Sequence, residues 1–509
     1  MVKIPKAKNA VKEKEFGLLD NYTFSSGKIE VTVKIILNSN EYVPSYEVST
    51  AILSRSTEIV LEKIRTELIK NLNFNTIRSD KNKDEVMEKE FIKDAEKLVI
   101  KFFPDMNEVQ QEYLVSYLLQ KSLGFGNLEL LLKDDLIEEI VVNSSEEPVW
   151  VYHKVHGWLK TNIFLNDEQE TKRYAVMVGR KIGRQISVLE PLLDANLSDG
   201  SRVNATFSPV SVSGNTMTFR KFSTEPMTIT HFLEFGTLDY DSAALIWHSI
   251  EYELSILISG GTASGKTSML NVLACFFPPN QRVLSIEDTR EVRLPKYLHW
   301  VPMMTRIQNA EGKGGISMGD LLVNSLRMRP DRIVVGEVRR KAEIQTLFEA
   351  IHTGHPCYAT IHANDVYETK KRLINPPLDV PLTMLSGVSL IVNQYRNRRS
   401  GKRRMFQIAE INKDSEVVLL KQYNPKTDKF MEIKKSKSLM STFMDYSGLS
   451  VKEINKELDE KKKVLDYLVK QKIKTVDEVG KVIAEYYINK KNLINFIKKN
   501  KTFSGYYAK

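Results

Sequence analysis

Residues 260–267 read Gly-Gly-Thr-Ala-Ser-Gly-Lys-Thr and match the pattern G-x-x-x-x-G-K-[ST] at every fixed position. The segment follows an apolar run, residues 254–258, that is typical of a buried strand, and precedes residues 269–273, whose apolar periodicity suits a helix. A strand, a glycine-rich turn and a helix N-terminus together surround an anion with backbone N–H groups. The pattern therefore predicts a phosphate-binding loop inside an α/β fold.

The residue types of this loop indicate which part of a nucleoside triphosphate each position would hold. We expect Lys266 to reach the terminal phosphates and the Thr267 hydroxyl to hold Mg²⁺. A chance match in a glycine-rich turn is the alternative, but the flanking strand and helix disfavour it. The predicted nucleotide-binding residues are Gly260, Gly261, Thr262, Ala263, Ser264, Gly265, Lys266, Thr267 and Ser268.

Composition limits the class of protein. With 509 residues, 42% of them hydrophobic, the chain is too long for one ordinary core and should form several domains. Two cysteines exclude a disulfide framework and a four-cysteine zinc site. No apolar run approaches the roughly 18 residues of a membrane span, so we expect a soluble cytoplasmic protein. The net charge of +10 suits anionic lipid or nucleic acid, and equally a plain solvated surface.

The sequence pattern divides the chain into five parts. Strand-like alternation precedes a helical stretch in an N-terminal accessory α+β segment, and a second α+β domain with leading helices follows. Beyond a hinge, short apolar strands alternate with helices, which predicts a parallel sheet covered by helices, and a Lys-rich helical extension ends the chain. The predicted boundaries are 1–75, 76–222, 223–230 for the hinge, 231–430 and 431–509.

Acidic residues follow two of the predicted strands after the loop. Glu287 comes directly after an apolar strand and could polarise water or hold Mg²⁺ through a water, or it could simply cap a helix. Residues 329–339 contain a second apolar strand that ends in an acid, as a Walker B segment does. The usual aspartate position holds Gly336, so we predict Glu337 to be the water-activating residue.

Histidines mark the last strand of interest. His355 and His362 bracket the apolar residues 357–361, and a polar side chain at the end of such a strand can sense the γ-phosphate. His352 is better explained as a structural residue. We therefore predict that at least one of His355 and His362 takes part in catalysis or sensing.

The order of loop, Glu-Asp pair, Arg-Pro-Asp…Gly-Glu segment and Thr-Gly-His…Thr-Ile-His-Ala segment resembles the secretion ATPase superfamily of type II secretion, type IV pili and archaella. Upstream segments are similar to the N-terminal domain of this family, so the resemblance covers about residues 90–415. The missing tetracysteine module, the segment 300–306 and the terminal extensions look more like the archaeal branch.

This resemblance implies a RecA-like motor domain in a homo-hexameric ring that binds ATP and Mg²⁺. It also implies that arginines of the N-terminal domain, here Arg202 and Arg220, reach the phosphates, and such arginines suit phosphate oxygens chemically. Ion-paired surface arginines are the alternative for both positions.

The resemblance further implies an ATPase at the inner face of the membrane that drives pilin assembly through a polytopic platform protein, with anionic lipid as a further contact. An archaellum motor and a protein secretion ATPase remain alternatives, as does a scaffold that binds ATP without hydrolysing it. A nucleic-acid translocase is less favoured, because the sequence shows no recognised DNA-binding motif, and no nucleic-acid partner is expected.

Overall fold

The chain divides into two compact units at residues 223 and 224. The computed structural model describes residues 17–499, apart from 40, 52, 72–82, 198, 223–224, 307 and 309–311, together with residue 503. The first two residues of the predicted hinge, the predicted boundary between residues 75 and 76 and the chain ends lie outside the described residues.

The first unit is built on one nine-stranded sheet with the order β1-β2-β3-β6-β5-β4-β9-β8-β7. Neighbouring strands are antiparallel except β3 and β6, which pair in parallel. β1 to β3, from the predicted accessory segment, thus continue the sheet that β4 to β9 form. The strands are β1 (Gly17–Ser26), β2 (Ile29–Leu37), β3 (Ser45–Ser49), β4 (Ile137–Val142), β5 (Trp150–His153), β6 (Gly157–Thr161), β7 (Leu192–Asn196), β8 (Arg202–Thr206) and β9 (Thr216–Arg220).

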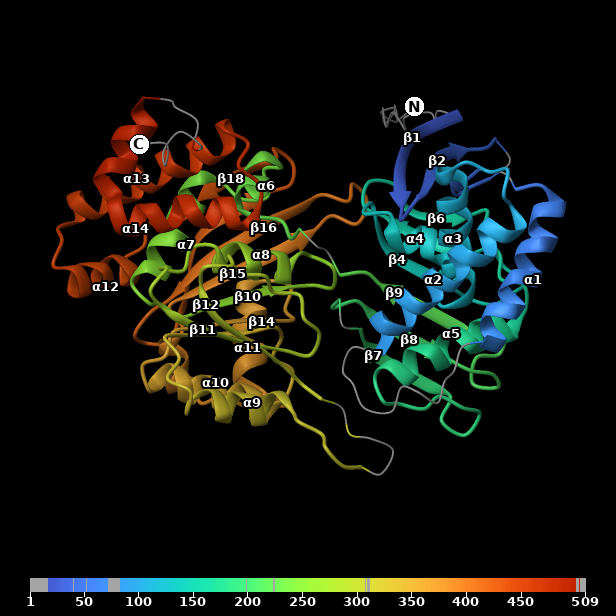
Figure 1. Cartoon of the computed structure of the whole chain (residues 1–509). Helices are drawn as coiled ribbons and strands as arrows, with labels where there is room; N and C mark the ends of the chain where they lie inside the picture. Colours follow the sequence, from blue (N-terminus) through green and yellow to red (C-terminus); the bar gives the residue numbers. More distant parts are fainter. Residues whose placement is uncertain are drawn as a thin grey trace, which may run out of the picture. The chain divides into compact units, whose positions relative to one another are not determined.

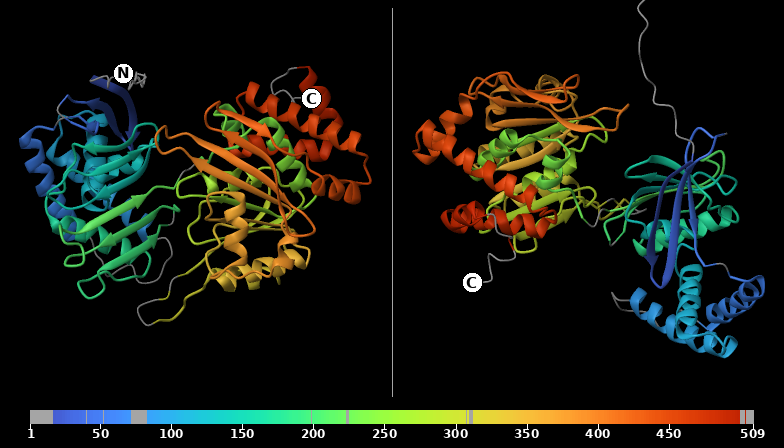
Figure 2. Two further views of the ribbon diagram at one scale, coloured as in Figure 1. Left: turned by 180° about the vertical axis from the view of Figure 1, so that it is seen from behind. Right: turned by 90° about the horizontal axis from the view of Figure 1, so that it is seen from above.

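Three helices of this unit pack mainly on one another. Apolar residues at helical spacing, such as Leu61, Ile64 and Leu68, are buried in a cluster with Phe91 and Leu114. Figure 2 shows these helices, in blue, as a bundle beside the sheet. The helices are α1 (Arg55–Asn71), α2 (Lys83–Phe102) and α3 (Glu108–Ser122), followed by α4 (Leu128–Lys133) and α5 (Glu168–Lys181).

The second unit contains a sheet with the order β12-β11-β13-β14-β10-β15-β16-β17-β18. The strands from β12 to β15 are parallel, and β16 to β18 extend the sheet in antiparallel fashion. The predicted parallel sheet is thus present. Its strands are β10 (Ile256–Gly260), β11 (Arg282–Glu287), β12 (His299–Met304), β13 (Arg332–Val335), β14 (Cys357–Ile361), β15 (Leu390–Arg396), β16 (Arg403–Ile411), β17 (Val417–Asn424) and β18 (Lys429–Glu432).

Helices cover both faces of this sheet (Figure 1). Successive strand residues face opposite sides, so Ile256 and Ile258 join one core cluster and Leu257 the other. Burial on both faces explains why these strands read as continuous apolar runs. The helices are α6 (Ile229–Glu234), α7 (Tyr240–Glu251), α8 (Lys266–Ala274), α9 (Met318–Ser325), α10 (Lys341–His352), α11 (Val366–Ile374), the 3₁₀ helix η1 (Leu382–Gly387), α12 (Ser438–Ser447), α13 (Val451–Lys470) and α14 (Val476–Lys498).

The C-terminal helices are part of this unit's core. Trp247 of α7 stacks on Phe276 with ring centroids 5.3 Å apart, and its indole nitrogen donates a 2.9 Å hydrogen bond to the Tyr487 hydroxyl of α14. Val464 and Leu468 of α13 are fully buried in the same cluster. The predicted fold class is confirmed: a RecA-like α/β unit with a C-terminal helical part follows an α+β unit.

Within the described part of the chain, no helix combines the length and apolar composition needed to cross a bilayer.

Candidate nucleotide-binding and hydrolysis site

The predicted phosphate loop connects the end of β10 to α8. Gly265 immediately precedes the helix with a φ of 96°, a left-handed conformation that glycine adopts at little cost. A side chain at Gly260 would place its Cβ 2.4 Å from Ser264 Oγ and 2.6 Å from the backbone oxygen of Gln394. Two of the motif glycines are therefore required by the backbone and by close packing, independently of any ligand.

The loop offers an environment that fits a phosphate group. The first N–H groups of α8 have no partner within the helix and carry its positive dipole end. The Ser264 hydroxyl is buried and has no hydrogen-bond partner among the described residues, and the Lys266 side chain lies within the same loop. The phosphate oxygens of a triphosphate would accept hydrogen bonds from these unsatisfied donors and pair with the buried ammonium.

The Lys266 ammonium also contacts a residue on a neighbouring strand. Its Nζ donates to Gly261 O at 3.0 Å and lies 3.4 Å from His362 Nδ1, while His362 Nε2 lies 2.9 Å from Glu337 Oε1. An ammonium can only donate, so His362 Nδ1 must accept, and the proton of a neutral ring then sits on Nε2, facing Glu337. Burial and the nearby charge of Lys266 lower the pKa of His362, which favours this neutral form.

Glu337 follows β13 at the same edge of the sheet. Its Oε2 accepts a hydrogen bond of 2.9 Å from Arg339, whose guanidinium also lies 3.9 Å from Asp288. Burial opposes ionisation of Glu337, but the hydrogen bond from Arg339 and the nearby charges outweigh it and lower the pKa of the carboxyl. Glu337 is thus a carboxylate, able to accept a proton, beside the phosphate loop.

Glu287, at the end of β11, is more deeply buried than a residue that only activates water would be. Its side chain is 2% exposed, and Oε1 accepts backbone N–H bonds of 2.9 Å from both Glu291 and Val292. Burial raises the pKa of this carboxyl to about 7. Oε2 has no hydrogen-bond partner among the described residues, so this single oxygen is what Glu287 could offer to Mg²⁺, with Thr267 as the other predicted ligand.

A side chain at Gly336, the usual aspartate position, would crowd Glu287. A Cβ added at Gly336 would lie 3.2 Å from Glu287 Cγ and 3.5 Å from its Cα. The Glu287 side chain therefore occupies the space beside Gly336, and the acid of this segment comes one residue later, at Glu337.

Only one of the two predicted histidines lies at the loop edge. Because β14 runs parallel to β10, its carboxyl end, followed by His362, lies beside the phosphate loop. His355 precedes β14, about 20 Å away along the strand at 3.3 Å per residue, and its Nδ1 contacts Thr353 Oγ1 at 3.1 Å. The structure therefore does not bring His355 together with Lys266 or Glu337 within one chain, because the strand separates the two edges.

The two predicted arginines belong to the first unit, on adjacent strands. Arg202 of β8 and Arg220 of β9 stand directly opposite each other in the sheet. Arg202 binds Asp194 through two nitrogens, with Nε 2.8 Å from Oδ1, and Arg220 Nε lies 3.9 Å from Glu139 Oε1. Each arginine thus has an acidic neighbour inside its own unit.

Two residues that contact this site were not predicted from the sequence. Arg339 was part of a recognised segment but received no role, although it binds Glu337. Arg403, at the start of β16, donates from Nε to Ala263 O at 3.1 Å. The sequence could have indicated Arg403, because it belongs to the basic run Arg396–Arg404 between two apolar stretches.

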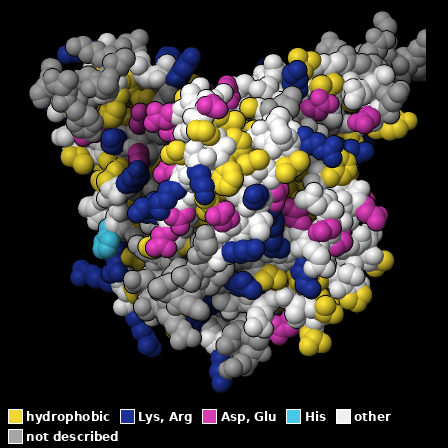
Figure 3. Space-filling model, turned by 45° about the vertical axis from the view of Figure 1, so that its right-hand side comes forward, with side chains coloured by type: hydrophobic (Ala, Val, Ile, Leu, Met, Phe, Trp, Pro, Cys, Tyr) yellow, Lys and Arg dark blue, Asp and Glu magenta, His cyan; other side chains and the backbone are white. Residues whose placement is uncertain are grey.

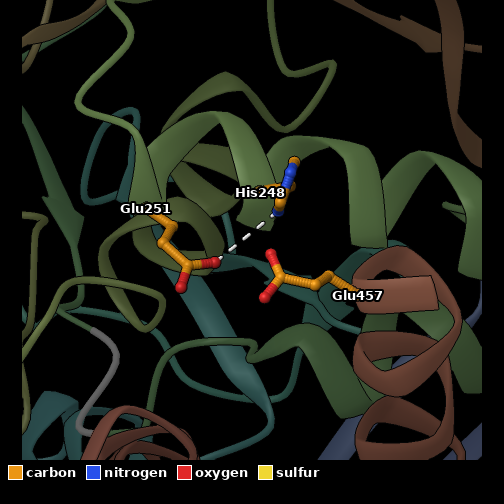
Figure 4. A group of neighbouring side chains, drawn as sticks. All are labelled: His248, Glu251 and Glu457. Carbon is orange, nitrogen blue, oxygen red and sulfur yellow. Dashed lines mark ion pairs between the residues drawn. The ribbon is translucent and has the colours of Figure 1, made fainter. Parts of the chain in front are cut away.

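A second cluster, remote in sequence, has metal-ligand chemistry. Among the described residues, His248, Glu251 and Glu457 place one ligand atom each within 4.8 Å of one another (Figure 4). The fully buried Lys461 has its Nζ 2.5 Å from Glu251 Oε2 and 3.0 Å from His248 Nδ1. The Lys461 ammonium already takes the place that a metal cation would have, so this cluster is a partly buried ion-pair network joining α7 to α13.

Comparison with known proteins adds independent information. The profile of the family described as type II/IV secretion system protein matches residues 137–427. An uncharacterized protein of the archaeon Methanocaldococcus jannaschii is 35% identical over 384 residues, which cover 73% of this chain and 69% of that protein. A putative conjugal transfer protein of Mycobacterium tuberculosis is 31% identical over 300 residues, covering 56% of this chain and 84% of that protein.

Among solved structures, the pilus retraction motor PilT with bound ADP is similar at 17% identity and a TM-score of 0.41, over 72% of this chain and 93% of that one. The family profile alone spans more than half of the 509 residues. The chain therefore belongs to the type II/IV secretion system family and is one of its ATPases.

Proposed function

We propose that this chain hydrolyses ATP at the loop edge of the second unit, with Glu337 as the residue that orients and deprotonates the attacking water. The observation that carries this proposal is the contiguous contact of Lys266, His362 and Glu337. A phosphate-binding ammonium then contacts a neutral imidazole, which in turn contacts a carboxylate.

The remaining parts of the site have distinct tasks in this proposal. The loop N–H groups and Lys266 bind the phosphates, Thr267 and Glu287 Oε2 hold Mg²⁺, and His362 senses the terminal phosphate. Mg²⁺ supplies charge neutralisation on the phosphates when bound. Arg339 balances the charge of Glu337 in the resting site.

We further propose that the ATPase works as a homo-hexamer that drives assembly of a type IV pilus-like filament through a polytopic membrane platform protein. Arg202 and Arg220 would complete the site by exchanging their acidic neighbours for phosphate oxygens. Membership of the secretion family supports this proposal, as does the resemblance of the motif order to filament-assembly ATPases.

We propose that the protein acts at the inner face of the membrane. On the face shown in Figure 3, Lys and Arg side chains lie among Asp and Glu side chains. Such mixed charge gives a uniform anionic lipid surface little net attraction. An isolated lipid bilayer is therefore expected to bind the protein weakly, with strong dependence on salt.

The hydrolytic assignment is tested by two variants of the full chain. Lys266→Ala should abolish ATP binding, whereas Glu337→Gln should bind ATP and release phosphate at least about 100-fold more slowly, as removal of a general base does. Normal hydrolysis by Glu337→Gln would refute the role of Glu337. The filament role is tested in cells that carry Glu337→Gln, where surface filaments should be missing in electron micrographs.

A protein or DNA transfer function is the competing proposal, because relatives include a putative conjugal transfer protein. Stimulation of phosphate release by single- or double-stranded DNA, falling steeply with salt, would favour that alternative. Stimulation by the platform protein and no response to DNA would favour filament assembly.

A further inference from the structure

The side chain of Arg403 lies against the phosphate loop, although the two segments are far apart in the sequence. Its Nε donates to Ala263 O at 3.1 Å across a separation of 140 residues. Its Cδ lies 3.7 Å from the position that a Cβ of Gly265 would take. The arginine thus contacts the middle of the loop from the β15–β16 hairpin.

A second arginine on the opposite face fixes this hairpin. Arg404 is 9% exposed, and its Nε and one terminal nitrogen lie 3.0 Å and 3.3 Å from the two carboxylate oxygens of Asp428. Tyr423 donates to the same carboxylate at 2.7 Å. Because successive side chains of a strand point to opposite faces, anchoring Arg404 directs Arg403 towards the loop.

The contact with Ala263 determines how the next peptide group is oriented. Ala263 has a φ of 56°, a left-handed conformation that non-glycine residues adopt only at a cost. The carbonyl of Ala263 and the N–H of Ser264 belong to one planar trans peptide, so they point in opposite directions. Since Arg403 holds the carbonyl on the outside, the N–H of Ser264 points to the inner side of the loop, where it donates a hydrogen bond of 3.4 Å to Gly261 O, the carbonyl that also accepts from Lys266.

We propose that Arg403 is a positioning residue of the ATPase, which holds the Ala263–Ser264 peptide so that the Ser264 N–H stays on the inner side of the loop, where an arriving phosphate can replace Gly261 O as its acceptor. It acts through the loop backbone and does not need to touch the nucleotide. The inference rests on the proposed role of this loop in ATP binding and adds to it a residue that preorganises the loop.

The competing explanation is purely electrostatic. Arg403 belongs to a run with six cations, Arg396, Arg398, Arg399, Lys402, Arg403 and Arg404, and no acid between its ends. Its charge could attract the phosphates at a distance without any role for the hydrogen bond. The two explanations differ in what an uncharged donor at the same position would do.

Glutamine separates hydrogen bonding from charge at this position. Its side-chain nitrogen follows three carbons, as Arg403 Nε does, so Arg403→Gln keeps an N–H donor near Ala263 O and removes the charge. Arg403→Met has similar length and neither property. Arg399→Ala is the matched control, because it removes a cation from an exposed position at the tip of the same hairpin.

Each full-length variant is titrated with Mg²⁺ and ADP by calorimetry and assayed for ATP hydrolysis. We expect Arg403→Met to weaken ADP binding about tenfold, or ~1.4 kcal/mol. Arg403→Gln and Arg399→Ala should stay within about threefold of the parent protein. Because the contact is present before the reaction, KM should rise in Arg403→Met while kcat changes less than about twofold.

Two results would overturn the inference: Arg403→Gln binding ADP as weakly as Arg403→Met, which shows a charge effect, or Arg403→Met binding as tightly as the parent. Arg403→Ala replaces Arg403→Met in the comparison if the latter does not fold. Lys266→Ala tests the proposed nucleotide site itself. Retained ADP binding in that variant would refute the loop as the nucleotide site, and the inference with it.

Discussion

Glu287→Gln should stabilise the protein increasingly as the pH rises. Burial raises the pKa of Glu287 from 4.5 to about 7, a difference of about 2.5 units (7 − 4.5). At 1.36 kcal/mol per unit, the ionised side chain costs the folded state about 3 kcal/mol once the pH exceeds both values. The stabilising protonated state is complete below pH 4.5 and is lost as the pH rises through 7.

Glutamine removes this titration and retains the structural contacts. Its amide oxygen can accept the N–H groups of Glu291 and Val292 as Oε1 does, and its amide nitrogen replaces the oxygen that has no partner among the described residues. The difference in unfolding free energy between Glu287→Gln and the parent should therefore grow by about 2–3 kcal/mol from pH 5 to pH 8.

Urea unfolding of nucleotide-free and metal-free protein, followed by tryptophan fluorescence, measures this difference at each pH. Asp288→Asn is the matched control, since that neighbouring side chain is 48% exposed and its carboxylate keeps contact with water. A difference for Glu287→Gln that stays constant between pH 5 and pH 8 would refute the argument from burial. Loss of ATP hydrolysis in the stabilised variant would support a metal-binding role for Oε2.

Further substitutions test particular contacts. Gly260→Ala should abolish nucleotide binding in a calorimetric titration, because the added Cβ would lie 2.6 Å from a backbone oxygen of Gln394, and binding at parental affinity would contradict the crowding. His362→Ala should slow phosphate release at saturating ATP at least about tenfold. His355→Ala should slow phosphate release about fivefold less than His362→Ala does in protein dilute enough to be monomeric, because β14 separates His355 from the loop edge. Equal effects of the two variants would contradict this separation. Lys461→Met should lower the unfolding free energy by about 3 kcal/mol in a urea titration, since it removes the nearest cation from the partly buried carboxylate of Glu251, and Lys461→Met with Glu251→Gln should recover most of that loss.

The loop and the parallel strands could be predicted because both depend on neighbouring residues. The pattern from Gly260 to Thr267 needs only a preceding strand and a following helix, and the apolar runs of β10, β11, β13 and β14 reflect burial on both faces. The separation of His355 from His362 also follows from strand direction, since one precedes and the other follows β14.

Contacts between distant segments could not be predicted in this way. The hydrogen bond from Arg403 to Ala263 depends on how the β15–β16 hairpin returns to the loop edge. The C-terminal helices looked like an appendage by their Lys-rich composition, yet the apolar faces of α13 and α14 complete the core around Trp247. Pairing of β3 with β6 likewise joins residues more than a hundred positions apart.

The acidic residues of the site are linked by packing. Glu287 fills the space beside Gly336, so a carboxylate at that position would meet the Glu287 side chain in a buried setting, and two close acids could not both ionise there. Moving the acid to position 337 places it at a partly exposed edge, where Arg339 and His362 can balance its charge. One packing constraint at Gly336 therefore has two consequences. Glu287 can be buried and anchor the loop after β11, and Glu337, whose charge is balanced by its neighbours, can face the phosphates.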